Sequence, residues 1–267
     1  MESLIHNYEE LCNNSETNFE FAKRIALKDL DHKVIEQYLY KEGVPLVITN
    51  ASLLWRKEKE LFTLSHLDHN VGHKTINVLN DENSTKIQCS VSEYIETLTS
   101  TENATATPQK CITPVPCPAQ WEQQIQQKLA YFSSKGGNDL LSEIDENLQW
   151  DCLQSEIQID QMYQGITMGT MGTIVNNLLV KTPNKNSFTL WFCSRTQDRD
   201  VIVNHWNNNV ISSFDFLSEN NEKLVEITEM SKYPCLIYII QQFEGDFVLL
   251  PSQSIYQRIT KVFFFFF

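Results

Sequence analysis

The segment from Tyr238 to Thr260 limits what this chain can fold into more than any other part of it. Tyr238–Gln241 is rich in aromatic and β-branched residues, Glu244–Asp246 contains the glycine of a tight turn, and Phe247–Leu250 is an apolar run that Pro251 ends. Two short runs of this composition around a turn predict a β-hairpin. We therefore expect strands to dominate the end of the chain.

The charge of the chain restricts its partners. It has 21 lysines and arginines against 34 aspartates and glutamates, a net charge of −13. Nucleic-acid affinity depends largely on basic side chains that displace counterions, so we expect no direct nucleic-acid binding. An acidic surface suits a basic peptide such as a histone tail. The same charge is also ordinary for a soluble intracellular protein.

The cysteines and the N-terminus indicate the compartment. Seven cysteines are scattered along the chain without a CxxC pair, and MESLIHNYEE lacks the basic and apolar regions of a signal peptide. No apolar run approaches the length of a membrane span. We expect an intracellular, soluble protein with reduced thiols and no membrane association.

The N-terminal part predicts helices and short strands. Residues 1–40 carry apolar side chains at helical spacing and predict an N-terminal helical segment. Residues 43–48 predict a turn into a buried strand, Lys74–Leu79 a strand and Ser90–Thr99 a helix. Residues 99–118 are rich in Thr, Ser and Pro and predict a surface loop or insertion.

The C-terminal part is mainly β in pattern. Ile157–Gln164 and Phe188–Cys193 predict strands, and Asp198–Asn208 predicts a helix before the final hairpin. With 42% apolar and 11% aromatic residues, the chain can bury a sizeable core. The fold class is therefore mainly β with flanking helices (α+β). The length of 267 residues fits one large domain, or one domain with an N-terminal elaboration.

Several blocks resemble the Jumonji-C (JmjC) family. The strongest is Gln-x-x-x-Gly-Asp-Phe-Val-Leu-x-Pro-Ser-x-Ser, which runs from Gln241 to Ser254 and is similar to the last conserved block of that family. Weaker matches are Gly43–Ile48, Tyr163–Gly165, Gly169-Thr170 and Trp191-Phe192. The resemblance implies a cupin-type double-stranded β-helix, or jelly roll, over residues 41–260. It also implies an Fe(II)- and 2-oxoglutarate-dependent oxygenase such as a histone lysine demethylase.

The positions at which this family binds iron hold other residues here. A histidine five residues after the proline ligates the metal in the family, and this chain has Tyr256 there. Aligning Gly169-Thr170 and Leu178 puts Val175 and Asn177 at the His-x-Asp/Glu positions. These three side chains are poor ligands for Fe(II). We expect no catalytic residues, no metal and no cofactor, and hence a non-catalytic binding protein or a degenerate gene copy.

Two further hypotheses concern other residues. His66-Leu67-Asp68 is a His-x-Asp outside the aligned positions, and His69 or His73 could complete a metal site with it. An active oxygenase using Fe(II) and 2-oxoglutarate would need such a site; these are otherwise surface residues. Four aromatic residues are a possible pocket for an aliphatic or methylated side chain, or simply core: Tyr163, Trp191, Phe192 and Phe247.

Residues 261–267 end in five phenylalanines and form a low-complexity tail, which we interpret as a truncated or misread terminus. No Lys/Arg cluster of nuclear-localisation type is present. A nuclear location and a chromatin partner are therefore implied only by the resemblance, and a cytoplasmic location is equally compatible with the sequence.

Overall fold

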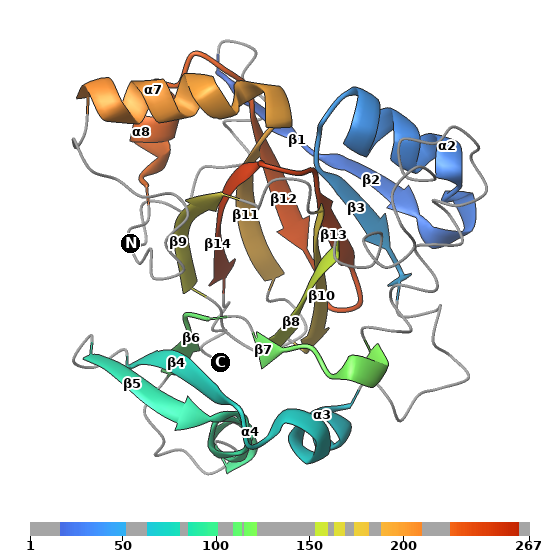
Figure 1. Ribbon diagram of the computed structural model, residues 1–267, viewed down its shortest axis with the longest axis vertical. Helices are drawn as coiled ribbons and strands as arrows, with labels where there is room; N and C mark the ends of the chain where they lie inside the picture. The colour runs from blue at the N-terminus through green and yellow to red at the C-terminus, as the bar shows by residue number, and fades with distance from the viewer. Residues whose placement is uncertain are drawn as a thin grey trace, which may run out of the picture.

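The computed structural model of this chain describes residues 17–51, 63–80, 85–100, 109–113, 115–121, 153–159, 163–168, 174–181, 188–209 and 225–261. In these ranges the protein is mainly β, with three sheets of five, six and three strands and a few short helices (Figure 1). No helix in them is long and apolar enough to cross a membrane.

The five-stranded sheet is antiparallel except at one edge, where β1 runs parallel to β12. Its strand order is β1 (Phe19–Phe21), β12 (Ile237–Gln242), β11 (Phe188–Ser194), β14 (Ile255–Lys261), β9 (Tyr163–Met168). Every residue of β11 is buried, because one face of this sheet packs on the larger sheet and the other lies under α7 (Arg199–Asn209) and α8 (Ile227–Met230).

The six-stranded sheet is mixed: β2 runs parallel to β3, and β8 runs parallel to β10. Its strand order is β2 (Lys23–Ala26), β3 (Leu46–Thr49), β13 (Phe247–Leu250), β10 (Ile174–Lys181), β8 (Leu153–Ile159), β7 (Val115–Pro116). Its outer face carries Leu178, Phe247 and Leu249, which join a core shared with the N-terminal helices. These helical turns are Leu27–Asp29, α2 (His32–Ile35) and Glu36–Lys41.

The third sheet, β5 (Thr85–Ser90), β4 (Thr75–Asn80) and β6 (Gln109–Cys111), packs with α3 (Leu64–Val71) and α4 (Val91–Ser100). Ser90 and Glu93 cap α4 reciprocally: the Glu93 carboxylate accepts from the Ser90 backbone N–H, and the Ser90 hydroxyl accepts from the Glu93 N–H. Ser-x-x-Glu is a known signal for the start of a helix, which explains why this helix was predictable.

The two larger sheets face each other across a buried interior. Val47, Val175, Val248 and Leu250 of the six-stranded sheet form one apolar cluster with Trp191, Cys193, Ile240 and Tyr256 of the five-stranded sheet. Consecutive side chains of a strand point to opposite faces, so only alternate residues reach this interior. The architecture in the described ranges is therefore a two-sheet sandwich with helices on its outer faces.

The predicted hairpin is wrong in its pairing, although its strands and turn are in the predicted places. β12 belongs to the five-stranded sheet and β13 to the six-stranded sheet, so the turn at Glu244–Asp246 crosses between the sheets. Gly245, with a φ of 82°, allows this reversal. In the structure β12 pairs with β11, and β13 pairs with β10 and β3. These pairings bury both faces of each strand, whereas a hairpin would leave one face in solvent.

The predicted helix over residues 1–40 is also wrong in part. β1 and β2 occupy Phe19–Ala26, and helical turns begin only at Leu27. Phe19 packs under α7 while Ala22 reaches the sandwich interior, so pairing with β12 and β3 overrides the helical spacing. Residues 1–16 lie outside the described ranges.

Four other predicted elements are present, and one predicted loop contains strands. The strand at Lys74–Leu79, the helices at Ser90–Thr99 and Asp198–Asn208 and the strand at Phe188–Cys193 are confirmed within one or two residues. The expected loop at 99–118 contains two short strands, β6 and β7, that extend existing sheets. Within the tail 261–267, only Lys261 is described, as the end of β14.

Candidate functional site between the two sheets

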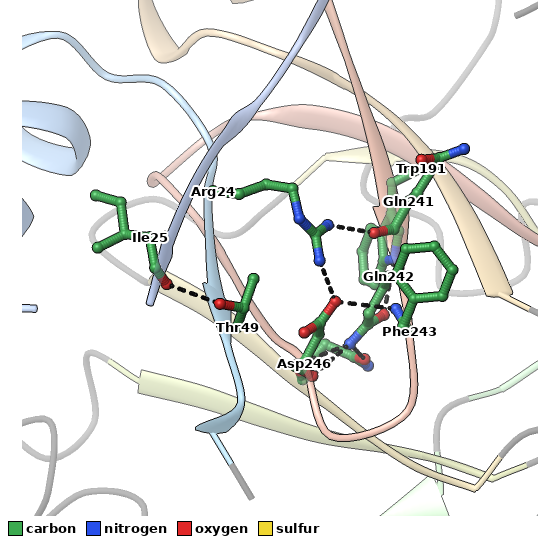
Figure 2. A network of polar contacts seen from close by, with 9 residues as sticks. Arg24, Ile25, Thr49, Trp191, Gln241, Gln242, Phe243 and Asp246 are labelled. Atoms are coloured by element: carbon green, nitrogen blue, oxygen red, sulfur yellow. Dashed lines mark hydrogen bonds and ion pairs between the residues drawn. The ribbon is translucent and has the colours of Figure 1, made fainter. Parts of the chain in front are cut away.

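A chain of hydrogen bonds links the two sheets at one end of the interior (Figure 2). Trp191 Nε1 donates to Gln242 Oε1 at 2.9 Å. Gln242 Nε2 lies within donating distance of the Asn177 side-chain and backbone oxygens at 3.0 and 3.1 Å, and of the Asp246 carbonyl at 3.2 Å. Gln242 and Asn177 are fully buried. Each buried polar atom of this network thus has a partner, as a low-dielectric interior requires.

Arg24 extends the network to the edge strand β2. Its guanidinium pairs with the Asp246 carboxylate and donates to the Gln241 carbonyl, and it lies 5.6 Å from the centre of the Phe243 ring (Figure 2). The same Asp246 carboxylate accepts from the Phe243 backbone N–H at 3.1 Å. Arg24 therefore holds the turn between β12 and β13 against the edge of the sandwich.

A buried cation stacks in the middle of the interior. Arg258, with no exposed surface, lies directly opposite Trp191 in the register of β14 and β11, and its guanidinium carbon is 4.6 Å from the centre of the Trp191 ring. This distance suits a cation–π interaction. Trp191 also contacts Tyr256, with ring centres 5.8 Å apart.

The three positions that the JmjC resemblance would assign to iron ligands all lie in this interior, engaged in packing or hydrogen bonding. Val175 and Tyr256 belong to the apolar cluster with Trp191, and the Asn177 side-chain oxygen faces the Gln242 amide. Valine offers no donor atom, and the asparagine oxygen is already the acceptor of a buried hydrogen bond. The geometry favours a filled core at these positions.

The opposite end of the interior is bordered by three loops. Ser254 Oγ donates to the Ser194 carbonyl at 2.6 Å, and Ser194 Oγ accepts from the Ile255 N–H at 3.0 Å. Thr196 Oγ1 donates to the Ser252 carbonyl, and the Thr196 N–H donates to the Gly43 carbonyl. Directly below them, Cys193 is completely buried, and this burial raises the pKa of its thiol.

The four aromatic residues proposed as a pocket are not brought together where their side chains are described. Trp191 faces the interior, Phe192 lies under α7 on the other face of the same sheet, and Phe247 lies on the outer face of the six-stranded sheet. Neighbours in a strand point to opposite sides, so Trp191 and Phe192 cannot share a pocket. Tyr163 lies on β9 opposite Ile259; its side chain is outside the described part.

His66 and Asp68, the alternative metal ligands, both lie on α3. The ring of His66 stacks on Trp121, with centres 6.0 Å apart, whereas Asp68 accepts a hydrogen bond from Ser92 of α4. Residues two apart on a helix point in nearly opposite directions, so the two do not converge. Among the residues that the structure describes, no group of three His, Cys, Asp or Glu side chains could hold a metal ion.

The residues of the polar network were missed by the sequence reasoning. Gln242, Arg24 and Arg258 were given no role. One signal was available: a glutamine and an arginine at inward positions of otherwise apolar strands are costly to bury unless they make specific contacts.

Comparisons with known proteins give one informative relative. No protein-family model matches the chain. The chain is 23% identical over 256 residues to C-module-binding factor A of Dictyostelium discoideum. This match covers 94% of the chain but only 25% of that protein, so the chain corresponds to one quarter of a much longer relative.

Proposed function

We propose that this chain forms a JmjC-type jelly-roll domain that has lost its iron site and works by binding rather than by catalysis. The observation that carries this proposal is the side chain of Asn177. At a position assigned to an iron-binding carboxylate, it is a buried amide whose oxygen accepts from Gln242. Ligation of a metal at this position would require that bond to break.

The order of the strands supports the jelly-roll interpretation. Successive strands β8, β9 and β10 alternate between the six- and five-stranded sheets, and β12, β13 and β14 alternate again. Alternation of this kind is typical of double-sheet jelly rolls, which differ in this respect from sandwiches built of hairpins. The turn at Glu244–Asp246, within the block that most resembles the family, is one of the crossings.

A binding role is supported by the relative and by the charge. The similar protein from Dictyostelium is named as a binding factor. The net charge of −13 favours a basic partner over a nucleic-acid backbone. We propose a basic peptide such as a histone tail, and with it a nuclear location, as the resemblance to JmjC proteins implies.

Fluorescence anisotropy with labelled histone-tail peptides tests the binding role. We expect saturable binding that weakens as salt is raised, because the attraction between exposed charges is screened. A scrambled peptide of the same composition is the matched control. Equal affinity for both peptides, or none for either, would reject a specific basic-peptide partner. The alternative function is that of an active oxygenase, which requires Fe(II) binding. A metal titration distinguishes this function from binding without catalysis.

A further inference from the structure

The three loops that meet above Cys193 come from distant parts of the chain. One contains Gly43, one runs from Ser194, the last residue of β11, to Asp198, and one joins β13 to β14 from Pro251 to Ser254; the last crosses the top of the sandwich in Figure 1. Four hydrogen bonds tie them together, each between an N–H or hydroxyl group and an oxygen of another loop or of its adjoining strand.

Two residues at this junction have positive φ angles, which a side chain makes unfavourable unless neighbouring contacts stabilise them. Gly43 has a φ of 62°, and a Cβ added there would lie 3.2 Å from the Thr196 Cβ. Gln253 has a φ of 61°, in the left-handed region that a side chain disfavours. Residues in such regions persist only where neighbouring contacts fix them. The bonds of Ser252 and Ser254 to the loop after β11 provide those contacts.

The interior begins immediately below these bonds. Ser194 follows Cys193 in β11, and Ser254 comes two residues before Tyr256, which is paired with Cys193 across the sheet. Both Cys193 and Tyr256 are buried. Reagents in solvent can therefore reach the Cys193 thiol only when the structure around it opens.

We propose that the Gly43, Ser194–Asp198 and Pro251–Ser254 loops form a latch that closes this end of the sandwich and can open locally while both sheets stay folded. The latch goes beyond the proposed function, because its opening does not depend on what the domain binds. It defines a second state in which the interior around Cys193 and Tyr256 is accessible. Local opening of three loops exposes much less surface than global unfolding and therefore costs less free energy.

The rate of Cys193 alkylation by N-ethylmaleimide, followed by peptide mass spectrometry on the full chain, tests the latch. Ser254→Ala removes the bond to the Ser194 carbonyl, and Gly43→Ala places a Cβ against Thr196. Each variant should raise the alkylation rate about tenfold. The lost contact is also absent from the unfolded state, so the midpoint of thermal unfolding should fall by about 3–5 °C while the variants stay folded at the assay temperature. Ser231→Ala is the matched control, because it removes an exposed hydroxyl bond to the Thr228 carbonyl at the end of α8 and should leave the rate unchanged.

Low concentrations of urea separate local opening from unfolding. If the latch opens by itself, the Cys193 rate in wild type and variants should depend only weakly on urea, since little surface is exposed. A rate that rises with urea as steeply as global unfolding does would overturn the latch. Unchanged alkylation in both folded variants would overturn it as well. Neither result would bear on iron binding, so the latch and the proposed function fail independently.

Discussion

Gln242 of β12 and Asn177 of β10 join the two sheets through a buried amide–amide contact of 3.0 Å. The pair lies between Trp191 on one side and the Arg24–Asp246 ion pair on the other. Asn177, which the JmjC resemblance aligns with an iron-binding carboxylate, is therefore part of the hydrogen bonding that joins the two sheets.

Replacing Gln242 with leucine should be strongly destabilising. The change leaves the Trp191 N–H and the Asn177 oxygen buried without their present partner, and each such loss costs about 1–3 kcal/mol. We expect urea denaturation to show a loss of roughly 2–4 kcal/mol in the free energy of unfolding. Gln37→Leu, at an exposed glutamine in the helical turn Glu36–Lys41, is the control and should cost less than about 0.5 kcal/mol. Similar values for both variants would argue against the network.

The contact between Arg24 and Asp246 should be measurable as a coupling. Asp246 is buried while Arg24 is partly exposed, so screening by solvent limits the strength of the pair. A double-mutant cycle with Arg24→Met and Asp246→Asn should give a coupling energy of about 1 kcal/mol that falls as salt is raised. Zero coupling at low salt would show that the ion pair does not hold the turn between β12 and β13.

The contact between α7 and α8 predicts a dependence of stability on pH. Hydrogen bonds from Lys232 and then His205 hold the pKa of Glu229 below its ordinary value. A carboxyl with a lowered folded-state pKa stabilises the protein fully above its unfolded pKa of about 4.3, and this contribution is lost as pH falls through the folded-state pKa.

Glu229→Gln should therefore be less stable than wild type near neutral pH. The difference in thermal midpoint should stay constant down to about pH 5 and shrink below about pH 4. Thr228→Val, at an exposed neighbour, is the control and should leave the pH profile unchanged. A difference that persists undiminished into acid would contradict the assignment.

The contact between α3 and α4 depends on a glycine. A Cβ at Gly72 would lie 2.2 Å from both the Asp68 carbonyl and the Ser92 hydroxyl, too close for either to remain in place. Gly72→Ala should therefore lower the free energy of unfolding by about 1–3 kcal/mol, as measured by urea denaturation. No loss would mean that the two helices can separate without cost.

The sequence predicted local structure better than it predicted pairing. The β11 strand and the Ser90–Glu93 cap follow from short-range patterns, and both are present in the structure. β1 and β2 were taken for helix because their strand character comes from pairing with β12 and β3, which are distant in the sequence. For the same reason the turn at Gly245 was predicted, but its crossing between sheets was not.

The contacts of the candidate site were likewise not predictable from local sequence patterns. The resemblance pointed to Val175, Asn177 and Tyr256, and all three are indeed interior residues. Their present partners depend on which strands face each other, and that information is absent from local patterns. Gln242 and Arg24 become recognisable as one network only when β2, β10 and β12 are placed side by side in space.

Anaerobic calorimetric titration of Fe(II) in the presence of 2-oxoglutarate tests the central claim most directly. We predict no saturable heat for the wild-type protein, because Val175, Asn177 and Tyr256 provide no iron site. The Val175→His/Asn177→Asp/Tyr256→His variant is titrated alongside, and binding by this variant alone would support both the alignment and the loss of the metal. Tight, stoichiometric Fe(II) binding by the wild type would contradict the account and favour the oxygenase.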